Sequence, residues 1–184
     1  MSFADVDLGQ GLVLRAWRES DAPRLAQIAN DVRVWRHMSD LFPHPYTLEI
    51  AQHWVTRGHI DFGGDNCAVL ELGVLIGAAG HHQDRGPQRC NSEIGYWLAP
   101  TAWGRGIATR VAAALTLKAF EPAEVTRVFA GIHAGNPASM RVLAKCGFER
   151  EGVLRLSTIK AGQAIDRVLY ARYREARPTQ PLAG

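Results

Sequence analysis

The sequence predicts a mixed α/β fold, in which helices cover both faces of one sheet. Short apolar runs with strand character alternate with stretches of helical periodicity along the chain. Near the middle, a strand-like run leads into a glycine turn and an apolar helix at 103–120. The last third adds another strand, a helix and two closing strands, so strands occur both before and after the helices.

Length and composition are typical of one globular domain. The chain has 184 residues, of which 47% are hydrophobic and 21% are charged. Its net charge of +3 is small and dispersed, so we expect no direct contact with nucleic acid. No apolar run is long enough to span a membrane, and none resembles a signal peptide. We expect one domain at 1–176 and a loose tail at 177–184.

The cysteines and histidines indicate neither a disulfide framework nor a metal site. Cys67, Cys90 and Cys146 are an odd number at no metal-ligand spacing, which predicts reduced thiols, a cytoplasmic location and no bound metal. His81 and His82 would point to opposite faces of a strand, so they could not chelate one ion together. No feature fixes the oligomeric state, and a homodimer remains open.

The first half of the chain predicts helices followed by a hairpin. After a short strand at 12–15, a helix begins at Ser20–Pro23, where a capping side chain and a proline stand together. A second helical piece at 32–38 precedes a loop, and a third helix starts at Thr47. Strand patterns follow at 67–72, 74–80 and 93–98, with turns near Gly73 and at 84–91.

The loop at 39–46 and the helical piece before it carry more aromatic side chains than a plain connection needs. They are Trp35, His37, Phe42 and His44. These residues either wall a substrate pocket or serve ordinary packing, and the sequence leaves both interpretations open.

The glycine turn has the features of a phosphate site. Two glycines and an alanine lie within 104–108, so the backbone can approach a ligand closely. The following helix carries a buried stripe at Ile107, Val111 and Leu115. Free N–H groups and the positive end of the helix dipole would meet at the turn, and Arg105 and Arg110 add positive charge. The structural alternative is a tight turn before a core helix.

The last third of the chain predicts strands that flank a capped helix. Asn136 and Pro137 open this helix, and Gly147 closes it. Ser139 shares its buried face with Val142, Leu143 and Cys146. The flanking strands are expected at 125–133, 148–159 and 164–173.

Two common nucleotide motifs are absent from the sequence. There is no G-x-x-x-x-G-K-[ST], which excludes the phosphate loop of nucleotide hydrolases. There is also no full G-x-G-x-x-G with an acidic residue about twenty positions later, which argues against a dinucleotide-binding fold.

Three segments together resemble the GNAT superfamily of acyl-CoA-dependent N-acetyltransferases. The turn matches the family signature Q/R-x-x-G-x-G/A at Gly106 and Ala108, with Trp103 in the first position. That departure is familiar in the branch that acetylates ribosomal-protein N-termini. The strand at 93–98 and the helix at 136–148 resemble the same branch. The similarity covers most of the chain.

The resemblance implies a mostly antiparallel sheet, splayed between its central strands, and acetyl-CoA as the co-substrate. The N–H groups from Arg105 to Thr109 would hold the pyrophosphate, the backbone at Leu98 and Ala99 would pair with the pantetheine arm, and Asn136 and Ser139 would lie near the sulfur. The implied cofactor-binding residues are Leu98, Ala99, Gly104, Arg105, Gly106, Ile107, Ala108, Thr109 and Asn136.

The implied reaction needs a base, because an amine with a pKa near 10.4 is mostly protonated at pH 7. Glu93 is the candidate, and an exposed strand carboxylate is the alternative interpretation. A free backbone N–H around Leu98 would bind the oxyanion. Many members of the family protonate the thiolate with a tyrosine, but Leu143 stands at that position here. The catalytic candidates are Glu93, Ser139 (as acid or as hydrogen-bond partner of the sulfur) and Asn136.

The predicted function is therefore transfer of an acetyl group from acetyl-CoA to a primary amine by direct attack in a ternary complex. A peptide or protein N-terminus is the favoured acceptor. The alternative within the same chemistry is a small-molecule amine. The alternative from another class is a catalytically silent acyl-CoA-binding regulatory module.

Overall fold

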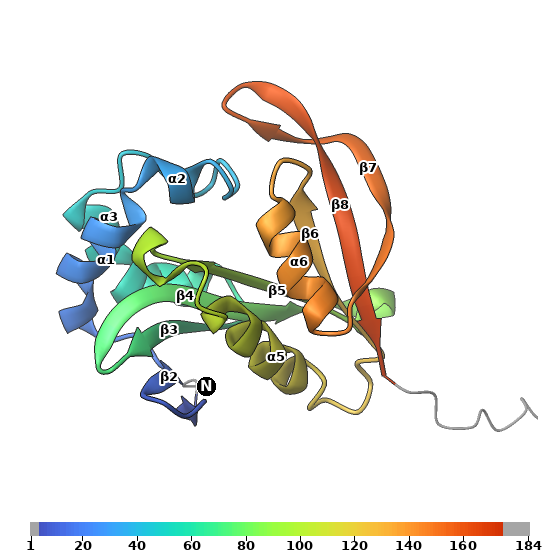
Figure 1. Cartoon of the computed structure of the whole chain (residues 1–184), viewed down its shortest axis with the longest axis horizontal. Helices are drawn as coiled ribbons and strands as arrows, with labels where there is room; N and C mark the ends of the chain where they lie inside the picture. The colour runs from blue at the N-terminus through green and yellow to red at the C-terminus, as the bar shows by residue number, and fades with distance from the viewer. Residues whose placement is uncertain (1–3, 175–184) are drawn as a thin grey trace, which may run out of the picture.

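The computed structural model describes residues 4–174, which form one eight-stranded sheet with helices on both faces (Figure 1). The strand order is β1-β2-β3-β4-β5-β6-β8-β7, and every neighbouring pair is antiparallel except β5 and β6. The strands are β1 Val6–Asp7, β2 Leu12–Arg15, β3 Asp65–Glu71, β4 Val74–Gln83, β5 Asn91–Leu98, β6 Arg127–His133, β7 Glu149–Lys160 and β8 Gln163–Tyr173. This arrangement confirms the predicted mixed, mostly antiparallel fold.

Five helices were expected from the sequence patterns, and the structure has six α-helices in residues 4–174, because one expected helix is divided. They are α1 Ala22–Ala29, α2 Val32–Trp35, α3 Leu48–His53, α4 His59–Asp61, α5 Ile107–Ala119 and α6 Pro137–Lys145. The helix expected from Thr47 is divided, because a π-helical turn at Trp54–Gly58 joins α3 to α4. Strand β1 was not predicted, since two residues are too short to show a period. The expected boundary at residue 176 lies outside the described residues.

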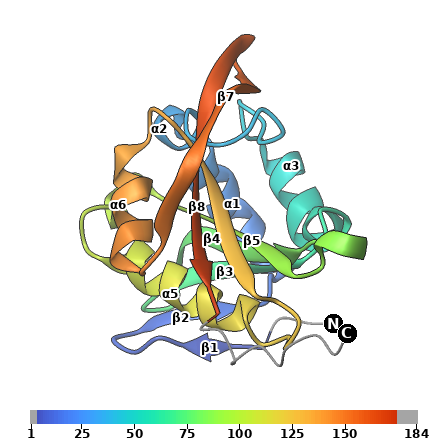
Figure 2. The same cartoon turned by 90° about the vertical axis from the view of Figure 1, so that its right-hand side faces the viewer.

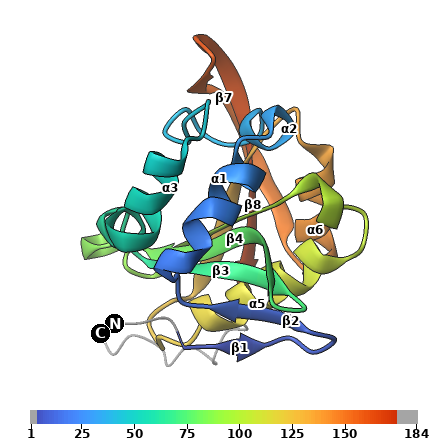
Figure 3. The same ribbon diagram turned by 90° about the vertical axis from the view of Figure 1, so that its left-hand side faces the viewer.

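Two apolar cores lie on opposite faces of the sheet. Figures 2 and 3 show the helices that cover these faces. Helices α5 and α6 bury Val111, Leu115 and Leu143 on one face, with 0% exposure each. Helices α1 and α3 bury Leu25 and Ala51 on the other. Side chains alternate along β5, so consecutive residues of this strand belong to different cores. In the described part of the chain, no helix combines the length and apolar character needed to cross a membrane.

The sheet splits between its two parallel strands. β5 and β6 pair only from Asn91 with Arg127 to Glu93 with Phe129. Beyond this point β5 continues to Leu98 and β6 to His133 without pairing to each other. Figure 1 shows β6 rising away from β5. The predicted splay between the central strands is therefore confirmed, and it leaves one side of each strand without a ladder partner.

Candidate functional site

The glycine turn lies where β5 leads into α5. Gly104 and Gly106 have φ angles of 74° and 76°, a left-handed conformation that glycine adopts without the steric cost of a side chain. A Cβ added at either position would meet no atom within 4 Å, so the space beside the turn is open. Gly106 is the N-cap of α5 and supplies no side chain to bond the first N–H groups of the helix.

Consecutive amide hydrogens at this turn are unpaired. The N–H groups of residues 104–108 have no hydrogen-bond acceptor within the described part of the chain. The N–H of Thr109 donates to the carbonyl of Gly106 at 3.1 Å. Thr109 is therefore removed from the predicted set of amide donors, because an early helical bond already uses its N–H. The remaining donors, at the positive end of a 13-residue helix, form an arrangement suited to phosphate.

The two arginines beside the turn already have partners in the protein. Arg105 donates from both terminal nitrogens to the Glu71 carboxylate, at 2.6 and 2.8 Å. Arg110 donates to Gln10 Oε1 and to the carbonyls of Leu8 and Gly9. The positive charge expected here is thus partly neutralised at Arg105, and Arg110 anchors α5 to the turn between β1 and β2.

The end of β5 directs backbone polar groups into the split. Ladder bonds alternate along an antiparallel strand, and Ala99 donates its N–H to Ile76 of the β4 segment at 2.7 Å. Leu98 must then direct its N–H and carbonyl away from β4, towards the split. The carbonyl of Leu98 accepts a bond from Trp103 Nε1 at 2.7 Å. The sequence analysis expected the backbone of both Leu98 and Ala99 to pair with the pantetheine arm. The N–H of Ala99 is not available for this, because it is bonded within the sheet, whereas the N–H of Leu98 points into the opening.

On the α5 face of the split, a partly buried tyrosine contacts the predicted serine. The Tyr96 hydroxyl lies 2.9 Å from Ser139 Oγ, across the gap between β5 and the first turn of α6. Burial raises the pKa of Tyr96 to about 12, although the bond to Ser139 acts in the opposite direction. The phenol therefore stays protonated at neutral pH and can donate to the serine or accept from it.

Asn136 holds Ser139 in place. The Asn136 side chain caps α6 by accepting the N–H of Ser139 at 3.1 Å. Leu143 is fully buried in the core of this face, so it offers no polar group to the split. The structure thus places Asn136 next to Ser139 and adds Tyr96, which the sequence analysis did not select.

Glu93 lies on the other face of the sheet, at the last pairing position before the split. Its side chain is 42% exposed, and its Oε1 accepts a hydrogen bond from Arg167 of β8 at 3.0 Å. Its second oxygen has no partner among residues 4–174. The carboxylate predicted as a base is therefore an oriented member of an ion pair with one free oxygen.

Gly131 of β6 creates the space for this ion pair. A Cβ at Gly131 would lie 1.9 Å from Nη2 of Arg167, 2.5 Å from Cζ and 2.7 Å from Nε. The guanidinium therefore lies flat over the glycine, where any other residue would displace it. One set of contacts thus links three strands: Arg167 of β8 lies over Gly131 of β6 and bonds to Glu93 of β5.

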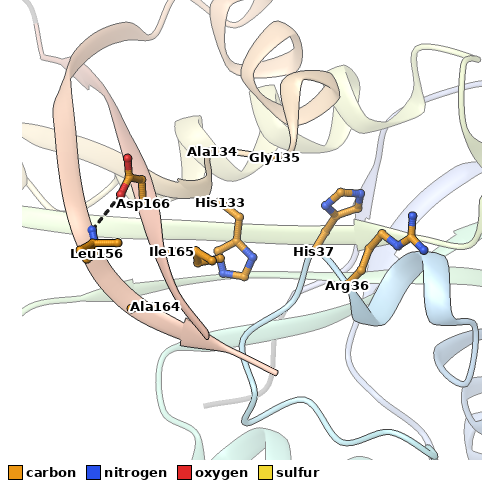
Figure 4. Close-up of a pocket in the computed structure, with 9 residues that line it drawn as sticks. All are labelled: Arg36, His37, His133, Ala134, Gly135, Leu156, Ala164, Ile165 and Asp166. Carbon is orange, nitrogen blue, oxygen red and sulfur yellow. Dashed lines mark hydrogen bonds between the residues drawn. The ribbon is translucent and has the colours of Figure 1, made fainter. Parts of the chain in front are cut away.

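A cavity of about 500 Å³ opens on this same face at the end of β6 (Figure 4). His133 and the backbone of Ala134 and Gly135 form its floor, and Arg36 and His37 approach from the segment after α2. The β7–β8 hairpin closes the remaining side with Leu156, Ala164, Ile165 and Asp166. Of the four aromatic residues considered for a pocket wall, only His37 lines this cavity. Phe42 instead packs against Tyr46 and Trp97.

The sequence and the fold both match known acetyltransferases. The profile of the acetyltransferase (GNAT) domain family matches residues 11–149. The chain belongs to the GNAT acetyltransferase family. YdaF of Bacillus subtilis (strain 168), a provisionally named ribosomal N-acetyltransferase, is 31% identical over 170 residues, which cover 89% of this chain and 92% of YdaF. Phosphinothricin N-acetyltransferase of Alcaligenes faecalis is 33% identical over 163 residues, covering 86% and 81%.

Among solved structures, RimL, a ribosomal α-N-protein acetyltransferase in complex with coenzyme A, superposes with a TM-score of 0.80 at 23% identity. The superposition covers 92% of this chain and 98% of RimL. This GNAT protein is an N-acetyltransferase that uses acetyl-CoA as its co-substrate, and the regulatory alternative is set aside. The unpaired amides at residues 104–108 and the open space beside Gly104 and Gly106 fit the coenzyme's pyrophosphate.

Three features of this acetyltransferase could not be found from local sequence patterns. The Arg167–Glu93 contact joins residues 74 positions apart, and Tyr96 and Ser139 are 43 apart. Gly131 sits within an ordinary strand pattern, where nothing indicates that an arginine will cover it.

No group of three or more His, Cys, Asp or Glu side chains between residues 4 and 174 is arranged to hold a metal ion.

Proposed function

We propose that this acetyltransferase acts on the N-terminal amine of a peptide or protein, with Glu93 as the base and the first turns of α5 and α6 as the coenzyme site. One observation carries this proposal: the split in the sheet lies between the unpaired turn amides and the oriented carboxylate of Glu93. When bound, acetyl-CoA supplies the thioester whose C–S bond is exchanged for the new amide bond. The residues of the chain provide binding, proton transfer and charge stabilisation.

Binding relies on backbone groups. The N–H groups of residues 104–108 would donate to the pyrophosphate, whose charge the dipole of α5 also favours. Because Gly104 and Gly106 carry no side chains, phosphate oxygens can approach these donors closely. The backbone of Leu98 would then meet the pantetheine arm at the mouth of the split.

Attack requires a neutral amine, since an ammonium group has no lone pair to donate. The free oxygen of Glu93 would take the proton of the amine, directly or through one water molecule, while Arg167 holds the other oxygen. The N–H of Leu98 points into the split and would donate to the oxyanion that forms on the attacked carbonyl.

Departure of the thiolate is assisted from the α5 face. Ser139 would hydrogen-bond to the sulfur, and the Tyr96 hydroxyl would orient Ser139 for that bond. A thiol with a pKa of about 8.5 leaves without obligatory protonation, so this assistance is smaller than the contribution of the base.

The relatives support the choice of acceptor. YdaF and RimL are both named for ribosomal N-acetylation, and they share most of their length with this chain. A small-molecule amine is the second candidate, favoured by the 33% identity to an enzyme named for phosphinothricin. A cytoplasmic location and a homodimer stay predictions.

Glu93→Gln tests the proposed base. The amide keeps the shape of the side chain but cannot accept a proton, so we expect kcat to fall by about 100-fold, with coenzyme A affinity within twofold of the unaltered enzyme. The pH profile of kcat/KM should change as well, because the variant lacks one proton acceptor. The measurements are thiol release with N-terminal peptides and calorimetric titration with coenzyme A.

Glu149→Gln is the matched control, because Glu149 is an exposed β7 residue far from the split in sequence and contact. It should leave all constants unchanged. An unaltered kcat in Glu93→Gln would remove Glu93 as the base. Absence of turnover with every peptide, alongside turnover of small amines by the unaltered enzyme, would select the second acceptor class.

A further inference from the structure

The cavity at the end of β6 lies beside the proposed base but is not part of the transfer machinery described above (Figure 4). His133 pairs in register with Arg167, whose guanidinium reaches Glu93. His133 stands four positions beyond Phe129, the residue paired with Glu93. At roughly 3.3 Å per strand residue, the cavity floor is about 13 Å along β6 from the base.

Arg36 is an exposed cation at the rim of this cavity, and Figure 4 shows its side chain pointing away from His133 and Asp166. Two other cations near the cavity have carboxylate partners: Lys160 lies 3.0 Å from Asp40, and Arg167 lies 3.0 Å from Glu93. Arg36 has no ion-pair partner among the residues that the structure describes, and it lines the cavity. Because no ion pair within residues 4–174 holds this exposed side chain, it can turn towards a ligand carboxylate without breaking an internal contact.

The two imidazoles of the wall experience a positive environment. Burial and then Arg36 lower the pKa of His37, and burial followed by Lys160 and Arg167 lowers the pKa of His133. Both rings are thus kept neutral near pH 7. The Nδ1 atom of His133 is buried without a hydrogen-bond partner among residues 4–174, so a polar group of a ligand can satisfy it.

The carboxylate on the opposite wall is already engaged. Asp166 Oδ1 accepts the N–H of Leu156 at 2.8 Å, and this bond holds the β7 bulge against β8. Asp166 lies across the cavity from Arg36 (Figure 4). An anionic ligand group is therefore attracted to the Arg36 side and not to the Asp166 side.

We propose that this cavity binds an acidic side chain of the acceptor through Arg36, so that the enzyme prefers peptides with a carboxylate within their first few residues. The inference rests on the proposed peptide acceptor. An extended peptide advances about 3.3–3.6 Å per residue, so a glutamate at the third position can reach the cavity while the terminal amine is near Glu93. The acidic group selects the substrate and takes no part in the transfer.

The test compares paired substrates that differ by one charge. Seryl-alanyl-glutamate amide and seryl-alanyl-glutamine amide share length, amine and shape. We expect the unaltered enzyme to favour the acidic peptide at least about tenfold in kcat/KM, the size of one charge-assisted hydrogen bond. In Arg36→Gln this ratio should fall to within twofold, with the constant for the neutral peptide unchanged.

Two further arms give specificity. Arg33→Gln is the matched control, since Arg33 precedes Arg36 by one helical turn, pairs with Asp31 and does not line the cavity. It should keep the preference. Free serine and serinamide test a different source of the carboxylate, namely the main-chain carboxylate of an amino acid. The enzyme would then prefer serine to serinamide, lose this preference in Arg36→Gln and show no preference among the peptides. That result would overturn the choice of an acidic side chain.

Binding separates this inference from the proposed reaction. N-acetylated forms of the two peptides cannot react, and calorimetry should show tighter binding of the acidic form, dependent on Arg36. If the acidic form binds more tightly but neither peptide is ever acetylated, the proposed function is contradicted and the assignment of the cavity stands. Turnover of both tripeptides at equal rates, or a preference that survives Arg36→Gln, would overturn the inference.

Discussion

The two faces of the split are built in different ways. The proposed coenzyme face combines the glycine turn with the first turn of α6, and its donors to the pyrophosphate would be backbone amides at consecutive positions. The proposed acceptor face combines charged side chains from β5, β8 and the segment after α2, which are distant in the sequence. On the first face the backbone conformation matters most, whereas on the second the identity of each side chain decides the chemistry.

This difference has a physical origin. A pyrophosphate is the same in every acetyl-CoA molecule, so amides fixed by a helix start can bind it without a particular side chain. An acceptor varies between enzymes, and its recognition needs charges placed by tertiary contacts. Substitutions that change backbone conformation should therefore affect mainly coenzyme binding, and those that change charge placement should affect mainly turnover and acceptor choice.

Among the substitutions that test this comparison, Gly106→Val should have the largest effect, and it tests the backbone half. A β-branched residue at a φ of 76° is strongly disfavoured, and its side chain would enter the space next to the unpaired amides. We expect coenzyme A to bind at least tenfold more weakly, as measured by calorimetry.

Gly152→Val is the control for this substitution. Gly152 is also surrounded by open space, lies on β7 and lacks a positive φ. It should bind coenzyme A with unchanged affinity. Equal affinity in Gly106→Val would mean that the turn amides do not hold the pyrophosphate.

Gly131→Ala tests the acceptor half. Its methyl group must displace the Arg167 guanidinium, because the nearest atom would be only 1.9 Å away. We expect kcat/KM for peptides to fall about fivefold to tenfold with coenzyme A affinity unchanged, since Glu93 loses its orienting partner. Stability should change by about 1 kcal/mol or less, because the ion pair is partly exposed.

A double-mutant cycle checks the route of this effect. If Gly131 acts through Arg167, then Gly131→Ala adds nothing to the loss caused by Arg167→Ala. Additive losses would show instead that the methyl group acts on the acceptor directly.

Tyr96→Phe examines the contact that spans the coenzyme face. Removing the hydroxyl frees Ser139 to rotate, so kcat should fall about threefold to fivefold at constant KM for acetyl-CoA. The pKa of Tyr96 in the folded protein is raised to about 12, whereas an unfolded tyrosine titrates near 10. Its contribution to stability is complete below pH 10 and is lost as the pH rises towards 12.

Thermal unfolding between pH 9 and 12 measures that contribution. The stability of Tyr96→Phe should fall less steeply over this interval than that of the unaltered enzyme. Tyr46, whose pKa burial also raises to about 12, provides the comparison, because Tyr46→Phe should change the alkaline slope without changing kcat.

Glu71→Gln should produce the smallest effect. It releases Arg105 from a contact with two hydrogen bonds, so the guanidinium can pair with a phosphate of the coenzyme. We expect coenzyme A affinity to rise about twofold to threefold at low ionic strength, with the gain lost at high salt. Arg105→Gln should show no such gain. Tighter binding in both variants would contradict a competition between Glu71 and the phosphate for Arg105.

The sequence alone determined the elements that depend on local chemistry. The glycine turn, the Asn136 cap and the Gly147 terminus follow from short-range rules, because each conformation is favoured within a few residues. Periodicity likewise placed the stripe of α5 in the core, and the family signature supplied the splayed sheet. These features were enough to predict the proposed coenzyme face and to place Glu93 on a strand beside the split.

Only the tertiary structure decided which groups meet around that framework. It paired Glu93 with Arg167 over Gly131 and set Tyr96 against Ser139. It left Arg36, beside a cavity, without an ion-pair partner among residues 4–174. It also withdrew the N–H groups of Ala99 and Thr109 from the predicted donors. Such contacts depend on strand order and register, and these arise when distant segments pack together, so no local pattern could predict them.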